Sequence, residues 1–407
     1  MGISLWTVFA VVTIIYVSSL FYRMAPSVLA LDIASDLHLG SSELSLIGSS
    51  AILGFGLMQL PSGMLSDRLG GKTTLLLLTL LAGISTAWFS MAESAASVAA
   101  SRFLTGLGVS ATIPCISILA RSVPPELFAR ISCLMYGCGA LGTLAAASPL
   151  ALASSVFGWR GSMLACGMLS LTLAALLLFF VKENSRPAMQ KTARNPFSGV
   201  FRVLSSRSFW LLCIVYSGTL ITFFGFYGLW FGPYMVEACG LSKLEAGSVL
   251  SAGAIAGIAG MPAAAILSDW LHSRKKAIIP MVLLSASCAG ILAFFPGKLP
   301  MAALMLIAAV LSFCNGLTGV ALTSGKELFP LAIMGTATGC LNTLPSLLGA
   351  ASQKIFGVIL EAGRQAGAEI PAAYGRAMLF YAAVMLCAAA ASFFIKDTHP
   401  SLYRPER

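Results

Sequence analysis

The sequence predicts an all-α membrane protein with twelve transmembrane helices, arranged as two related six-helix halves. Three observations carry this prediction. Of the 407 residues, 58% are hydrophobic and only 10% are charged, which is far more apolar than a water-soluble domain. The apolar residues form runs of the length that crosses a bilayer, about 20 residues for each helix. Short motifs also recur about half a chain apart.

Twelve apolar runs are separated by polar connections, and each run can satisfy its own backbone hydrogen bonds in lipid as a helix. The runs cover approximately residues 6–33, 44–65, 73–92, 98–120, 130–153, 161–181, 209–232, 245–267, 277–295, 300–324, 333–358 and 375–395. All six tryptophans fall at or near the ends of these runs: Trp6, Trp88, Trp159, Trp210, Trp230 and Trp270. This placement is typical of an aromatic belt at the membrane interfaces.

The basic residues predict that both termini are cytoplasmic. With that orientation, one side of the membrane carries 17 of the 25 basic residues: Arg68, Lys72, Arg121, Arg130, Lys182, Arg186, Lys191, Arg194, Arg202, Arg207, Arg274, Lys275, Lys276, Lys326, Lys396, Arg404 and Arg407. The positive-inside rule makes this side cytoplasmic. The net charge of +10 therefore reflects topology, and it gives no reason to predict a nucleic-acid partner. We expect a multi-pass protein of the plasma membrane, which is the inner membrane in a bacterium.

A basic, polar segment divides the chain into two sets of six spans. We expect an amino-terminal bundle over residues 1–181, a cytoplasmic linker over 182–207 and a carboxy-terminal bundle over 208–407. Within the linker, residues 197–204 could form an amphipathic helix on the membrane surface or belong to a solvated tether. The sequence leaves both alternatives open.

The two halves carry related motifs. Leu65-Ser66-Asp67 follows the second span, and the same three residues recur as Leu267-Ser268-Asp269 after the eighth. Two parallel six-span repeats, each interrupted by glycines, are typical of carriers whose pathway forms between halves that rock about a central site.

The connection after the second span reads GMLSDRLGGK, over residues 63–72. It resembles the signature of the major facilitator superfamily, Gly-x-Leu-(Ala/Ser)-Asp-Arg-x-Gly-(Arg/Lys)-(Arg/Lys), with glycine replacing one basic residue. The resemblance implies a gating role for Gly63, Asp67 and Arg68. The second copy keeps Asp269 but has Trp270 in place of the arginine, so we expect a weaker contact there.

The fourth span carries a second motif of the same family. Arg102, Gly106 and Gly108 resemble its Arg-xxx-Gly-x-Gly pattern, and the sequence FGWR before the sixth span is also typical. The resemblance thus covers essentially the whole chain. Arg102 is a candidate for ion coupling, or else a structural arginine that bonds backbone carbonyls.

The first span presents a polar stripe on an apolar helix. Tyr16, Ser19, Arg23 and Ser27 stand at helical spacings, so they share one face. A membrane-embedded arginine costs about 2.5–3.5 kcal/mol on insertion scales, which favours a functional use. Its planar fork matches a carboxylate or a phosphate. We predict that this stripe binds substrate, against the alternative that Arg23 forms an internal ion pair or extends to the interface.

Tyr22-Arg23 followed by Pro26 also resembles the anion:cation symporter and organophosphate permease branches of the superfamily, in which a first-span arginine binds the anion. Exchangers of organophosphates commonly have a second arginine in the seventh span, but here that region reads FFGFY, over residues 223–227. We therefore predict a small carboxylate-type anion as the substrate.

Other polar residues of the spans could line the same cavity or join neighbouring helices. Those predicted to contact substrate are Tyr136, Tyr227, Asn315 and Asn342. The centre of each span lacks Asp and Glu, so Asp32, which lies nine residues beyond Arg23, is the remaining coupling candidate beside Arg102. Proton or sodium coupling, anion exchange and facilitated diffusion all remain open.

Other function classes fit less well. The three histidines lie in loops or the tail, and the sequence has neither HExxH nor a P-loop, so we expect no catalytic site, metal or cofactor. A drug or lipophilic-cation exporter of the same superfamily and a transporter-like solute sensor remain alternatives. We expect the protein to work as a monomer.

The resemblance generates one prediction about gating. We expect Asp67→Asn to lower transport while substrate binding is largely kept, because the carboxylate at the helix end would contact amides of a neighbouring helix only in one conformation. Uptake into proteoliposomes and binding to the purified protein measure the two effects separately. Unchanged transport would mean that this loop is only a tight turn.

Overall fold

The structure is a computed structural model that describes residues 5–181, 196–330 and 333–398. Its helices are α1 (Leu5–Met24), α2 (Pro26–Asp36), α3 (Ser41–Leu69), α4 (Gly71–Ser90), α5 (Ala95–Gly108), α6 (Thr112–Ser122), α7 (Pro125–Ala145), α8 (Ser148–Phe180), α9 (Pro196–Leu204), α10 (Arg207–Leu220), the π-helix η1 (Ile221–Trp230), α11 (Phe231–Glu237), α12 (Lys243–Trp270), α13 (Arg274–Phe294), α14 (Met301–Cys314), α15 (Leu317–Glu327), α16 (Met334–Gln365) and α17 (Ile370–Ser392).

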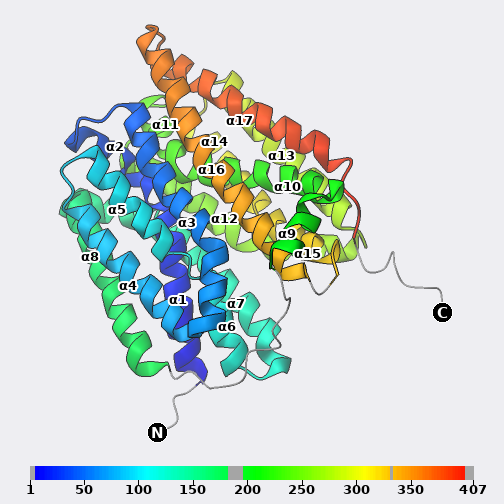
Figure 1. The fold of residues 1–407 in the computed structure, drawn as a ribbon. Helices are drawn as coiled ribbons and strands as arrows, with labels where there is room; N and C mark the ends of the chain where they lie inside the picture. Colours follow the sequence, from blue (N-terminus) through cyan, green and yellow to red (C-terminus); the bar gives the residue numbers. More distant parts are fainter. Residues whose placement is uncertain (1–4, 182–195, 331–332, 399–407) are drawn as a thin grey trace.

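These helices form the predicted fold class. Within the described residues, eleven helical segments are long and apolar enough to cross a membrane, and α7 adds a shorter apolar helix over Leu134–Ala145. The long helix α8 is two helices joined at Gly158, where φ is 69°. Its first part completes the fifth span after α7, and its second part is the sixth. In Figure 1 the blue to cyan helices form one half and the yellow to red helices the other.

Several spans that the sequence predicts as continuous are interrupted. The first span breaks at Ala25 because Pro26 has no N–H to donate to the preceding turn. The fourth span breaks between α5 and α6, and the tenth breaks at the corresponding place, between α14 and α15. The seventh span contains η1, whose wider turns follow from i→i+5 hydrogen bonds. Interruptions at matching positions of two repeats are a pointer to a central binding site.

Glycines let the helices approach closely where the spans cross. A Cβ built on Gly106 would lie 2.0 Å from the carbonyl oxygen of Ala51, and one on Gly142 would lie 2.1 Å from that of Val17. Both distances are shorter than a van der Waals contact, so only glycine fits. Because lipid supplies no hydrophobic drive between helices, such close backbone packing stabilises the bundle.

Two tryptophans differ from the predicted interfacial belt. Trp159 and Trp230 are buried, whereas Trp6, Trp88, Trp210 and Trp270 are well exposed. The Trp230 indole nitrogen donates a hydrogen bond to the carbonyl oxygen of Gln353. Proximity to a span end is therefore not sufficient to place a tryptophan at the interface.

The second part of the linker is helical. Helix α9 buries Val203 and leaves Phe201 exposed, and it packs against α16. Of the two alternatives for this segment, a helix with an apolar side is the one observed. The boundaries of the two bundles and of the linker stay a prediction.

The glycine contacts predict a difference between two substitutions on one helix. We expect Gly142→Ala to lower the free energy of unfolding by about 1–3 kcal/mol, because its methyl group would overlap the α1 backbone. Gly137→Ala is the matched control, since a Cβ there meets no atom within 4 Å, and it should be neutral or stabilising. Thermal unfolding in detergent measures both. Equal effects would contradict the close-packing role of Gly142.

Candidate functional site

Arg23 lies between the two halves of the molecule. Its side chain is only 7% exposed. The centre of its guanidinium group lies 4.3 Å from the ring of Phe55 on α3 and 5.5 Å from the ring of Phe224 on η1. These rings come from opposite halves, so Arg23 faces the interface between the halves and does not point into lipid.

The positive charge of Arg23 has no carboxylate partner among the residues that the structure describes. Its Nε donates to the carbonyl oxygen of Ser19 at 3.1 Å, and its Nη2 donates to the Ser19 hydroxyl at 3.3 Å. The Ser19 hydroxyl in turn donates to the carbonyl oxygen of Val109 at 2.6 Å, which fixes its position. The Nη1 edge is left for another acceptor. A buried, unpaired cation is costly, so an anionic ligand would be favoured here.

A cluster of three tyrosines extends toward Arg23. The hydroxyl groups of Tyr16 on α1 and Tyr216 on α10 are within electrostatic range of its guanidinium group. Tyr16 meets Tyr136 of α7 edge to face, with ring centres 5.6 Å apart, and Tyr136 is 36% exposed. The Tyr216 hydroxyl donates to Oδ1 of Asn342 on α16 at 3.2 Å. The structure thus brings together Tyr16, Ser19, Arg23, Tyr136 and Asn342, all predicted to bind substrate.

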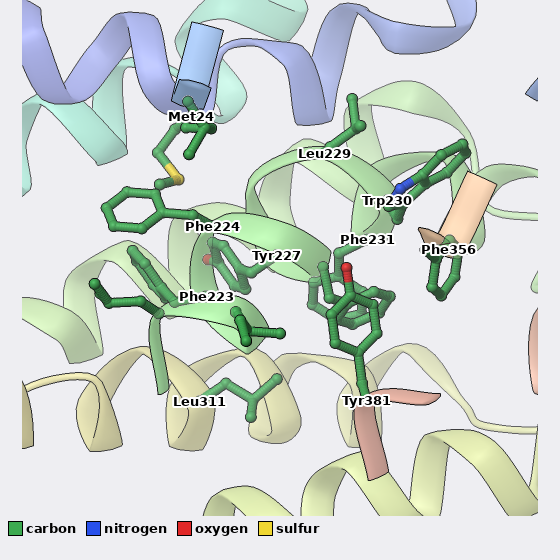
Figure 2. Packing of buried hydrophobic residues seen from close by; sticks show 14 of the residues in the cluster. Met24, Phe223, Phe224, Tyr227, Leu229, Trp230, Phe231, Leu311, Phe356 and Tyr381 are labelled. Carbon is green, nitrogen blue, oxygen red and sulfur yellow. The ribbon is translucent and has the colours of Figure 1, made fainter. Parts of the chain in front are cut away.

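Three other predicted residues lie in different surroundings. The Tyr227 hydroxyl donates to the carbonyl oxygen of Leu250 at 2.9 Å, and its ring stacks on Phe223. Figure 2 shows this packing beside Phe224 and Met24. Asn315 lies at the break between α14 and α15, where its Oδ1 is buried and has no hydrogen-bond partner in the described part of the chain. The Ser27 hydroxyl accepts the backbone N–H of Gly232 at 3.2 Å.

The π-helix explains why Tyr216 and Tyr227 separate. With α-helical spacing throughout the seventh span, Tyr216 and Tyr227 would lie on one face. In η1 each residue advances the helix by a smaller angle, because its hydrogen bonds span five residues. Tyr227 is therefore turned into the carboxy-terminal half, and only Tyr216 stays near Arg23.

Arg102 donates to a backbone carbonyl oxygen that Pro26 leaves without its helical donor. In a regular helix the N–H of residue 26 would donate to the carbonyl oxygen of Tyr22, but proline has no N–H. Nη2 of Arg102 donates to that carbonyl oxygen instead, at 3.0 Å. This contact supports the alternative in which Arg102 is a structural arginine, and a coupling role for it stays a prediction.

On one side of the molecule, named here the α2 side, contacts join the two halves. Asp32 of α2 forms an ion pair with Lys243 at the start of α12, and Lys243 also donates to the Ser154 hydroxyl. The N–H of Ser41 donates to a carboxylate oxygen of Glu361 at 3.1 Å. Figure 1 shows α2 and α11 together on this side. Asp32, a coupling candidate, is thus a bridge between the halves.

Sequence comparison agrees with this architecture. Residues 11–353 match the Major Facilitator Superfamily. The chain belongs to this superfamily.

Two curated relatives cover most of the chain. NiaP of Bacillus subtilis (strain 168), named for niacin/nicotinamide transport, is 27% identical over 350 residues, 84% of each chain. GudP of the same organism, named for galactarate/D-glucarate transport, is 26% identical over 398 residues, covering 87% of this chain and 86% of GudP. Niacin, galactarate and D-glucarate are organic acids, in keeping with the predicted resemblance to organic-anion branches. This Major Facilitator protein is a transporter and not an enzyme.

A solved structure shows the same fold. It is a bacterial homolog of the human lysosomal transporter Spinster, in an inward-facing and unoccupied conformation. It aligns with a TM-score of 0.76 at 19% identity, covering 95% of this chain and 96% of that chain.

The gating segment of this Major Facilitator protein is only partly described. Asp67 lies near the end of α3, but its side chain falls outside the described part, so its contact stays a prediction. Arg68 is exposed. A Cβ on Gly63 would be 3.7 Å from Ile113, an ordinary contact that does not require glycine. Asp269 pairs with Arg274 at 2.9 Å, inside the carboxy-terminal half.

Sequence reasoning missed several residues of this transporter's interface. Phe55 and Phe224 gave no signal, because an aromatic residue in an apolar span is ordinary packing. Gln353 gave one: it is a buried amide in a span, and its Nε2 donates to the carbonyl oxygen of Phe224 at 2.7 Å. Lys243 gave no signal, since its partner Asp32 is distant in sequence.

Proposed function

We propose that this protein is a secondary active transporter that moves a small carboxylate-type organic anion by alternating access. The observation that carries the proposal is Arg23, a buried guanidinium between the two halves without a carboxylate partner in the described chain. An anion bound there would contact both halves, so its affinity would depend on how they are placed. The organic acids in the names of NiaP and GudP support the same substrate class.

The two alternative functions, a lipophilic-cation exporter and a solute sensor, require different ligand behaviour at this site. A lipophilic cation would be repelled by Arg23, so the charge disfavours the exporter. A solute sensor would bind the same anion without moving it. Uptake of the bound anion into proteoliposomes distinguishes the carrier from the sensor.

We further propose a bacterial inner-membrane protein with both termini cytoplasmic, working as a monomer. The positive-inside distribution of its basic residues supports this orientation, which places the α2 side outside the cell. Proton or sodium coupling remains part of the proposal, with Asp32 and Arg102 as the candidates. Since both already have partners in the described chain, coupling would require these contacts to break during transport.

The ion pair of Asp32 with Lys243 supports alternating access, because it closes the α2 side by joining the halves. Close packing adds to this closure: a Cβ on Gly232 of α11 would overlap the carbonyl oxygen of Ser27 on α2. Opening this side would break the ion pair and separate α2 from α11. We propose that these contacts are the outer gate.

The first prediction concerns Arg23. We expect Arg23→Ala to abolish stabilisation of the purified protein by organic anions, with at least a hundredfold loss of affinity, because a desolvated charge pair is worth about 3 kcal/mol or more. Arg23→Lys should recover only part, since it lacks the bidentate fork. The measurement is a thermal-shift titration over carboxylates, organophosphates, amino acids and lipophilic cations.

Lys354→Ala is the matched control, since it removes another cation from a span. Lys354 follows Gln353, whose amide bonds η1, so it points about 100° away from that helix. Its loss should leave anion binding unchanged. An anion that stabilises the wild type and Arg23→Ala equally would remove Arg23 from the site.

The second prediction concerns the gate. We expect Lys243→Ala and Asp32→Asn each to increase the population open on the α2 side, and the double variant to add little, because both remove one contact. Spin labels on Glu93→Cys and Glu369→Cys, one in each half, would report the distance between the halves. The exposed native Cys387 is replaced by serine so that it does not take up the label.

Arg160→Ala is the control for the gate. It breaks the ion pair with Asp36 at 2.9 Å, on the same side but inside one half, and should leave the distances between halves unchanged. Distance distributions that do not differ between wild type and Lys243→Ala would refute the gate.

A further inference from the structure

We propose that the site at Arg23 selects aromatic monocarboxylates over sugar acids and saturated carboxylates. The inference rests on the proposed function and names the substrate class of that same site. Two observations carry it: among the described residues Arg23 is the cation that lies between the halves without a carboxylate partner, and aromatic rings from both halves lie against it.

The available charge matches one carboxylate. Arg23 offers its Nη1 edge, whereas Arg102, a buried arginine of the fourth span, is bound to the carbonyl oxygen of Tyr22. Lys243 is paired with Asp32 on the α2 side. A dicarboxylate would therefore place its second charge in apolar surroundings without a counter-ion, which is costly. This favours a monocarboxylate.

The surroundings of Arg23 are aromatic from both halves. Phe55 and Phe224 lie against its guanidinium group. Tyr16, whose hydroxyl group is within electrostatic range of Arg23, meets Tyr136 edge to face. An acid held by its carboxylate at Nη1 would extend its body among these rings. An aromatic ring gains edge-to-face or stacked contacts there that a saturated ring of equal size lacks.

Hydroxyl groups on the substrate would find few hydrogen-bond donors at this site. Hydrogen bonds within the described residues already use the proton of the Ser19 hydroxyl, donated to Val109, and that of the Tyr216 hydroxyl, donated to Asn342, so neither group can donate to a substrate hydroxyl. A sugar acid carries a hydroxyl on nearly every carbon, and a buried hydroxyl without a partner costs about 1–3 kcal/mol. The site is thus better matched to an apolar ring than to a polyol.

Tyr136 is the residue through which this recognition can be tested. It is the most exposed of the three tyrosines beside Arg23, at 36%, so its ring has surface left to contact a ligand. Tyr16 and Tyr216 are buried and support the neighbouring helices. A substitution at Tyr136 should therefore alter the ligand contact with little effect on folding, which the unliganded thermal unfolding temperature checks.

The experiment compares benzoate with cyclohexanecarboxylate, which share one carboxylate and one six-membered ring but differ in aromaticity. We expect benzoate to bind the wild-type protein at least tenfold more tightly, which corresponds to about 1.4 kcal/mol. Tyr136→Leu should reduce this ratio several-fold while cyclohexanecarboxylate binding stays nearly constant. Tyr136→Phe should preserve the ratio, because it keeps the ring. Glucuronate and glucarate are the sugar-acid probes, and all affinities come from thermal-shift titrations.

The outcomes distinguish failure of the aromatic selectivity from failure of the proposed organic-anion carrier. Equal binding of benzoate and cyclohexanecarboxylate, or an unchanged ratio in Tyr136→Leu, overturns the aromatic selectivity. Tight, Arg23-dependent binding of glucuronate or glucarate without benzoate binding overturns the substrate class but keeps the organic-anion carrier. Absence of binding by all four carboxylates, with stabilisation by a lipophilic cation, overturns the proposed function itself.

Discussion

One uncompensated charge organises the centre of this molecule. A guanidinium group in a low-dielectric interior needs either an anion or water, and the described chain gives Arg23 no carboxylate. Ser19 orients the group, and rings from both halves flank it. Because the two halves meet at this charge, we propose that an anion which neutralises it links binding to the relative placement of the halves.

Interruptions in the helices place polar groups around this centre. Pro26 frees the carbonyl oxygen of Tyr22, and Arg102 bonds it from α5, so a break in one span is stabilised by a residue of another. The break in the fourth span has a counterpart in the tenth, at Asn315, and the seventh span changes to a π-helix. Non-helical backbone at membrane depth is tolerated only inside protein or beside a cavity, and these breaks are all inside.

The candidate site was predictable where a signal is local. Tyr16, Ser19 and Arg23 share a face because α1 is regular up to Met24, and the structure keeps them together. Tyr227 was also predicted to contact substrate, but η1 turns it away from them. Periodicity alone does not reveal a π-helix, since its residues are as apolar as those of an α-helix. The ion pair of Asp32 with Lys243 between the halves could not be predicted from the sequence either, because the two residues are 211 positions apart.

By itself the sequence determined the membrane class, the spans, the repeat of two halves and the presence of a deep arginine. The free energy of inserting a segment into the membrane depends on that segment's own residues, so a hydropathy pattern is enough to find the spans. Only the tertiary structure decided which side chains surround that arginine, that Arg102 bonds the backbone of α1, and which contacts join the two halves on the α2 side. Those outcomes depend on how helices distant in sequence pack together, and packing in lipid follows local shape and hydrogen bonding that a hydropathy pattern does not encode.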